Sequence, residues 1–340
     1  DSLRALLEPP FAKPVLHQAL EAYSGLAQYY RGDVVEFAEA NLTLATGLSV
    51  MQTAEDAAQS IDAFISYLHG QESTSHDDFA LGVDCYVKML SLGEMVDVPL
   101  SQIEAAGEHE LLRHQALIRD AAGRIAPGKP LAEAILVVTK DHPSADKLID
   151  ETREMLEEIR SFTIEHDIAS VVSEVRAEVR ETPAFMRWAF AAMNGPGPFE
   201  KVATESFYYV TPVEANWTPE QSEEWLSNFG YATLKIISIH EAYPGHYVHF
   251  LRHANAPSAV SKVFGAYSFW EGWAHYCEEM FLEAGYGDGD PKMQLAMAQE
   301  ALVRVCRLLC SLRMHTKGQT LAESEQFFQQ EAFMEELPAK

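Results

Sequence analysis

Hydrophobic side chains recur at helical spacing over most of the first part of the chain. Residues 16–128 are predicted to form successive amphipathic helices, one of which presents Ile61, Phe64 and Leu68 on a single face. A long helix is expected over about 100–123, after a proline that can precede its first turn. These apolar faces are typical of a helical core rather than of a cofactor site.

Several helix starts are marked by capping residues. Asp33 and Thr53 each stand before or at the start of a predicted helix, and a further helix is expected from about residue 144 or 146 to His166. Residues 218–221, Thr-Pro-Glu-Gln, form a capping box with proline at the first helical position. This predicts a helix that starts at once after Thr218.

The pattern changes to a period of two in two short stretches, over residues 174–180 and 205–211. A Gly- and Pro-rich segment, 194–198, lies in the loop region between them. We therefore expect a mostly α-helical fold with a small antiparallel β element. The exposed edge of such an element can pair with an extended peptide, or the element can be a purely structural hairpin.

The length of 340 residues is enough for a large core. We expect a single helical domain, with an N-terminal scaffold over 1–130 and a metal-binding part over 131–340. No apolar run of 18 residues is present, so a membrane span is not expected. The chain begins at Asp1 without a methionine, which is compatible with a cytoplasmic protein or with export after removal of a signal peptide.

The charge balance narrows the range of partners. The chain has 51 acidic and 25 basic residues and a formal net charge of −26, so nucleic acid and anionic membranes would be repelled. The four cysteines form no CxxC pair and are expected to be reduced or buried. Oligomeric state is left open by these features.

The strongest chemical signal lies within residues 236–279. An apolar run leads to His240 and Glu241, His246 follows, and Glu271 stands further on in a Trp-Glu-Gly-Trp stretch. Two histidines and a glutamate are the ligand types of a catalytic zinc site, which uses three protein ligands and leaves a position for water. Glu241 would then be the base that takes the proton of that water.

The spacing of the two histidines departs from the usual zincin motif, in which they stand at i and i+4. A spacing of six would set the rings about 120° apart on an ideal helix. Pro244-Gly245 lies between them and permits the break that a shared metal requires. The alternative is that His240 and His246 are ordinary, partly buried histidines near a turn, but carboxylates in such apolar surroundings favour a metal.

Further candidates follow on the predicted helices. His275 and Glu278 fall on the same helix face as Glu271, where His275 could donate to a substrate oxyanion and Glu278 could orient a ligand histidine. Arg304 and Arg307 lie in an apolar helix and are expected to meet carboxylates. These carboxylates would belong either to protein glutamates or to a substrate.

The motifs His-Glu-Ala-Tyr-Pro-Gly-His, over 240–246, and Glu-Gly-Trp-Ala-x-Tyr-x-Glu, over 271–278, resemble those of the DUF885 family. The resemblance runs from about residue 141 to the C-terminus. It implies a zincin-like metallopeptidase architecture, zinc as cofactor, His240, His246 and Glu271 as its ligands, and Glu241 as the catalytic base. Family members continue with a tyrosine-rich, glycine-containing segment beyond the point at which this sequence stops, which implies either that the sequence is a trimmed form or that one wall of the site is missing.

The expected function is a zinc-dependent hydrolase of peptide bonds, with carboxypeptidase action as one form of it. The candidates for steadying the oxyanion are not ranked by the sequence; they are His275, Tyr208, Tyr209 and His315. A zinc amidase acting on a non-peptide substrate would use the same ligands. A non-catalytic binding protein with a structural metal is the third reading, although a structural site would normally have four protein ligands.

Overall fold

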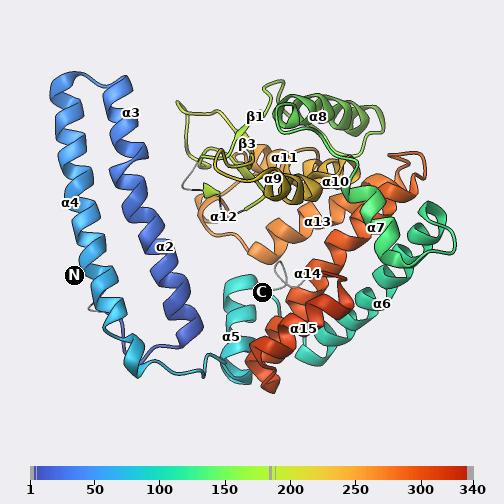
Figure 1. Ribbon diagram of the computed structural model, residues 1–340, viewed down its shortest axis with the longest axis horizontal. Helices are drawn as coiled ribbons and strands as arrows, with labels where there is room; N and C mark the ends of the chain where they lie inside the picture. Colours follow the sequence, from blue (N-terminus) through green and yellow to red (C-terminus); the bar gives the residue numbers. More distant parts are fainter. Residues whose placement is uncertain (1–3, 5, 184–185, 188, 335–340) are drawn as a thin grey trace. The chain divides into compact units, whose positions relative to one another are not determined.

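The computed structural model describes residues 4, 6–183, 186–187 and 189–334. These residues are mostly helical, with one small sheet (Figure 1). The chain divides into two compact units, one of residues 1–81 and 183–188 and one of residues 82–182 and 189–340. A compact unit is a region of dense contacts and not necessarily an independently folding domain, so the single domain with a division near residue 130 stays a prediction.

The first unit is built from the helices α2 (Lys13–Arg31), α3 (Asp33–Asn41) and α4 (Leu44–His69). The long helices α2 and α4 pack side by side, as Figure 1 shows in blue. Their small core includes Leu16, Leu20 and Leu68. Helix α4 begins nine residues before Thr53, because the Thr43 hydroxyl accepts a hydrogen bond from the third backbone N–H of that helix. The predicted start at Thr53 is therefore wrong.

The second unit contains the remaining helices and the sheet. Its helices are α5 (Val83–Glu94), α6 (Leu100–Ile125), α7 (Leu131–Thr139), α8 (Leu148–Glu165), α9 (Pro219–Leu226), α10 (Tyr231–Glu241), α11 (His246–His253), α12 (Ala259–Val263), α13 (Tyr267–Glu283), α14 (Pro291–Lys317) and α15 (Leu321–Glu331). The capping box predicted at Thr218 is present and starts α9, which confirms that expectation.

Helix α10 lies at the centre of this unit and contacts α7, α8, α13, α14 and the sheet (Figure 1). Its side chains Leu234, Ile236 and Ile239 are fully buried. Helices α6 and α14 pack closely along their lengths. A Cβ added to Gly107 of α6 would lie 2.8 Å from Cδ2 of Leu309 on α14. A helix that packs against several neighbours provides a rigid support for the residues at its end.

The sheet has three strands in the order β1 (Glu178–Glu181), β3 (Phe207–Val210), β2 (Ala191–Asn194). β1 and β3 are parallel, whereas β2 and β3 are antiparallel, so the sheet is mixed and not antiparallel as predicted. The sequence pattern missed β2 because Ala-Ala-Met-Asn has no alternation of polar and apolar side chains. That strand forms an edge of the sheet.

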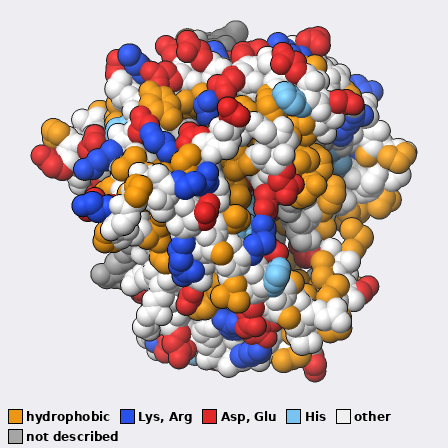
Figure 2. Space-filling view, turned by 90° about the vertical axis from the view of Figure 1, so that its right-hand side faces the viewer, with side chains coloured by type: hydrophobic (Ala, Val, Ile, Leu, Met, Phe, Trp, Pro, Cys, Tyr) orange, Lys and Arg blue, Asp and Glu red, His pale blue; other side chains and the backbone are white. Residues whose placement is uncertain are grey.

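Within the described residues, no helix is both long and apolar enough to span a membrane. One face of the molecule carries acidic and basic side chains close to one another, with hydrophobic side chains between them (Figure 2).

Candidate metal centre

The two histidines of the motif lie on either side of a break between α10 and α11. Helix α10 ends at Glu241 and α11 begins at His246, and in between the Gly245 N–H donates to the carbonyl of Ile239, six residues earlier, at 3.1 Å. A Cβ on Gly245 would lie 1.7 Å from the carbonyl oxygen of His240, so only glycine fits this bend. The bend brings the two rings to a centroid separation of 4.8 Å, nearly perpendicular at 89°.

Glu271 from α13 completes a cluster of three donor groups. Its carboxylate oxygens lie 3.5 Å from His240 Nε2 and 3.6 Å from His246 Nε2, and all three donor atoms fall within 4.8 Å of one another. Ligand atoms held tetrahedrally by zinc at about 2.0–2.1 Å are separated by about 3.3 Å. The donor types suit zinc, and the two carboxylate–nitrogen distances are close to this separation.

The cluster is open on one side. The side chains of His240 and His246 are only 8% and 10% exposed, whereas that of Glu271 is 61% exposed. Hydrogen bonding to both histidines holds the pKa of the Glu271 carboxyl far below its usual range. An ion bound here would be held by buried nitrogens and would face solvent on the side of the carboxylate.

A fully buried carboxylate stands behind His240. Glu278 accepts a hydrogen bond from His240 Nδ1 at 2.7 Å, and the guanidinium of Arg304 contacts its two oxygens at 2.9 and 3.1 Å. Burial raises the pKa of Glu278, but Arg304 and His240 outweigh this and lower it to about 2. Burial likewise lowers the pKa of His240, and Glu271 with Glu278 raises it to about 9. Glu278 thus fixes the ring so that Nε2 points into the cluster.

The expected base lies between the cluster and the sheet. Glu241 is the last residue of α10 and is 9% exposed, and its Oε2 accepts a hydrogen bond from the backbone N–H of Met193 at 2.8 Å. Met193 belongs to the edge strand β2. One carboxylate oxygen is therefore anchored, and an edge strand runs beside the carboxylate.

The four candidates for the oxyanion site are placed very differently. The Nδ1 of His275 lies 3.6 Å from Glu278, and its side chain is 30% exposed, one helical turn after Glu271. Tyr208 is fully buried and its hydroxyl contacts Ser238 at 3.2 Å, so it belongs to the core between the sheet and α10.

The other two candidates have no contact with the cluster among the described residues. Tyr209 points to the opposite face of the sheet from Tyr208 and stacks on Phe207. His315 stacks on Tyr86 of α5 at a centroid distance of 5.6 Å. Among the four, His275 is the one that the fold brings next to the cluster of His240, His246 and Glu271, through Glu278.

Two contacts at this candidate site were not foreseen from the sequence. Met193 contacts Glu241 through its backbone N–H, and a pattern of side chains cannot predict such a contact. Trp273 donates from Nε1 to the carbonyl of Pro244 at 3.0 Å and so ties α13 to the bend between the histidines. The tryptophan that follows Glu271 by two residues was the available signal for that second contact.

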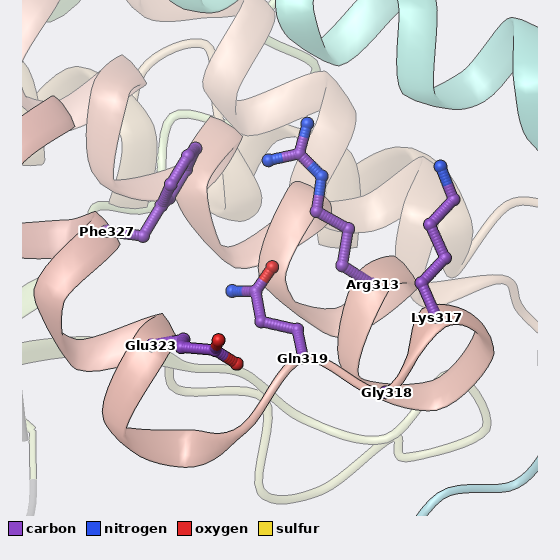
Figure 3. Close-up of a pocket in the computed structure, with 6 residues that line it drawn as sticks. All are labelled: Arg313, Lys317, Gly318, Gln319, Glu323 and Phe327. Atoms are coloured by element: carbon purple, nitrogen blue, oxygen red, sulfur yellow. The ribbon is translucent and has the colours of Figure 1, made fainter.

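A separate cavity of about 410 Å³ lies where α14 turns into α15 (Figure 3). Its two cations, Arg313 and Lys317, extend toward α6 and form ion pairs with Glu104, and Arg313 also pairs with Glu108. The positive charge in this cavity is therefore already neutralised.

Comparisons with known proteins give a family and a fold. The family model DUF885, described as a bacterial protein of unknown function, matches residues 3–340. A search of functionally curated proteins finds no match. A candidate lipoprotein of unknown function from Shewanella oneidensis has a similar structure, with a TM-score of 0.76 and 25% identity over 95% of this chain and 61% of its own. A candidate lipoprotein from Colwellia psychrerythraea gives 0.75 and 16% over 97% of this chain and 59% of its own. The chain thus spans about three fifths of the length of these structures.

Proposed function

We propose that this chain, which belongs to the DUF885 family of bacterial proteins of unknown function, is a zinc-dependent hydrolase of peptide bonds with a zincin-like site. The observation that carries the proposal is the convergence of His240 Nε2, His246 Nε2 and the Glu271 carboxylate within 4.8 Å, with Glu241 adjacent in sequence to the first of them. Three protein donors with an open side are typical of catalytic rather than structural zinc sites.

The residues of the cluster and their neighbours have separate roles in the proposed reaction. His240, His246 and Glu271 would hold the ion, and the buried Glu278 keeps the His240 ring in the orientation that binding requires. When bound, zinc polarises the scissile carbonyl and makes a water molecule more acidic. Glu241, anchored by the Met193 N–H, would accept the proton of that water and later deliver it to the leaving amine.

A peptide is favoured over other amides by the edge strand next to Glu241. The N–H of Met193 points away from β3 to the Glu241 carboxylate, so β2 faces the catalytic base with its outer edge. Extended peptides bind to such edges through their main chain. A non-peptide amide is the second candidate, because the same three ligands would serve it.

The metal proposal is tested by elemental analysis of protein purified without added metal. We expect about one zinc per chain in the wild type and a large loss in Glu271→Ala, whose exposed side chain can be removed without opening the core. Glu283→Gln, an exposed change on the same helix, should keep the zinc. Full zinc occupancy and affinity in Glu271→Ala would remove this residue from the ligand set.

The hydrolase proposal is tested with a mixture of peptides of defined sequence, read by mass spectrometry. Glu241→Gln keeps an oxygen acceptor for the Met193 N–H but removes the base, so we expect zinc and fold to be retained and turnover to fall by about 100-fold or more. Glu283→Gln is again the control. A Glu241→Gln protein that cleaves at the wild-type rate would exclude this carboxylate as the base. Amide cleavage that is confined to non-peptide substrates would favour the second candidate.

A further inference from the structure

The two arginines of α14 have different surroundings. Arg304 is held by Glu278 and by Glu300, 3.5 Å away, so its guanidinium is occupied within the protein. Arg307 is exposed and makes no hydrogen bond or ion pair with any residue that the structure describes.

Both arginines nevertheless belong to the same face of α14. At 100° per residue, Glu300, Arg304, Arg307, Ser311 and His315 fall within an arc of about 80° on the helix. The contacts of Arg304 and Ser311 show which helices this face of α14 is directed toward. The Arg304 side chain reaches Glu278 of α13, and Ser311 lies 3.2 Å from the hydroxyl of Tyr86 on α5. The opposite face, which includes Leu309, packs on α6.

Helix α13 approaches the same region from the other side. Its residues Ser268, Glu271 and Glu278 share one face at helical spacing, and the backbone N–H of Ser268 donates to Glu94 of α5 at 2.8 Å. On each helix, one exposed charged residue therefore lies on this face between the residue of the buried Glu278–Arg304 pair and the residue that contacts α5.

These two exposed residues are Glu271 on α13 and Arg307 on α14. They stand on facing helices, each between the same buried ion pair and the same helix α5. Both side chains are exposed to solvent, and each belongs to the helix face that carries one partner of the buried ion pair.

We propose that Arg307 binds the C-terminal carboxylate of a peptide substrate, so that the enzyme removes residues from the C-terminal end. This rests on the proposed function. A guanidinium binds a carboxylate through two parallel hydrogen bonds, and Arg307 carries the unpaired cation on the face that leads to the cluster. Hydrolysis would break the C–N bond of the last peptide unit; water supplies hydroxyl to the acyl carbon and a proton to the released amine.

The test separates binding from cleavage. An N-acetylated tripeptide ending in leucine is used as the free acid and as the C-terminal amide, with wild type, Arg307→Gln and Arg153→Gln. Arg153 is an exposed arginine on α8, paired with Asp150 and remote in sequence from the site, so it controls for the loss of one positive charge. Affinity is measured by calorimetry on each protein as purified, and cleavage products are identified by mass spectrometry.

We expect wild type and Arg153→Gln to bind the acid about tenfold or more tightly than the amide, in the range of hydrogen bonds to charged groups, and Arg307→Gln to lose this preference. Equal affinity for the two forms in wild type, or no binding of either, refutes the carboxylate site. A preference for the acid that survives in Arg307→Gln also refutes it. Preferential binding of the acid without any cleavage would instead count against the hydrolase and leave Arg307 as a carboxylate site.

Discussion

Removal of the Arg304 charge is the most direct test of the hydrogen-bond network behind the cluster of His240, His246 and Glu271. In Arg304→Met the guanidinium is replaced by an apolar side chain, while Glu278 stays fully buried with His240 as a hydrogen-bond partner and His275 Nδ1 3.6 Å away. The wild-type contact joins both carboxylate oxygens to the guanidinium at 2.9 and 3.1 Å. The variant therefore removes the guanidinium counter-charge and leaves the buried carboxylate with imidazole partners alone.

Two estimates of the cost agree. Unit charges about 4 Å apart interact by about 4 kcal/mol at an effective dielectric constant of 20. Breaking one partner out of a buried pair costs about 3–5 kcal/mol in proteins. Because the His240 hydrogen bond to Glu278 remains, we expect the lower end, about 3 kcal/mol, which corresponds to a fall in Tm of about 6–12 °C for a unit of this size.

The assay is urea and thermal unfolding in the presence of a chelator, so that metal binding does not contribute to stability. Arg153→Met provides the comparison, because its pair with Asp150 is 55% and 74% exposed and is expected to be worth less than about 1 kcal/mol. The double variant Arg304→Met with Glu278→Gln should be more stable than Arg304→Met alone, since no unpaired charge is then buried.

The reasoning would be refuted if Arg304→Met lost no more stability than Arg153→Met. It would also be refuted if neutralising Glu278 in the Arg304→Met background gave no recovery. Either result would mean that the carboxylate is not held as an ion by this arginine.

Three further outcomes are expected. In Gly245→Ala the new Cβ collides with a carbonyl oxygen, so the free energy of unfolding should fall by about 3 kcal/mol and zinc affinity should be lost. Gly123→Ala is the control in the same unfolding assay: open space surrounds Gly123 in α6, so the free energy of unfolding should rise by up to about 1 kcal/mol. The pKa of the Glu279 carboxyl is lowered mainly by its hydrogen bond with Arg113. The stabilisation from this ionised carboxylate is therefore present above the unfolded-state pKa of about 4.3 and is lost as pH falls through the folded-state pKa. In Glu279→Gln, Tm should consequently fall less steeply as the pH is lowered. Tyr208→Phe should cost about 1 kcal/mol of stability and leave turnover within about twofold, because its hydroxyl bonds within the core; a loss of turnover without a loss of stability would return Tyr208 to the catalytic candidates.

The sequence predicted those parts of the fold that depend on local patterns. The capping box at Thr218 and the long helix after Pro99 are local signals, and both are present. The Pro244-Gly245 break was required by the six-residue spacing of the two histidines, and the structure contains it. A steric requirement between residues close in sequence can be read without knowing the rest of the chain.

Features that depend on distant partners were not predictable in the same way. The parallel pairing of β1 with β3 depends on where the chain returns after β2, and β2 itself has no distinctive composition. The two arginines of α14 are equivalent in sequence, and only the position of Glu278 on another helix separates the paired one from the exposed one. Similarly, Tyr208 and Tyr209 differ in the side of the sheet on which they fall.

The bend between α10 and α11 has a consequence for attempts to copy this site into other proteins. The two imidazoles meet because a glycine permits backbone contact at the bend and because the indole of Trp273 is bonded to the carbonyl of Pro244. A straight host helix that carried the same side chains at the same interval would point them apart. Transplantation would have to include the bend, the neighbouring helix with its tryptophan and the strand that anchors Glu241, so the smallest portable unit is a three-part assembly rather than a seven-residue motif.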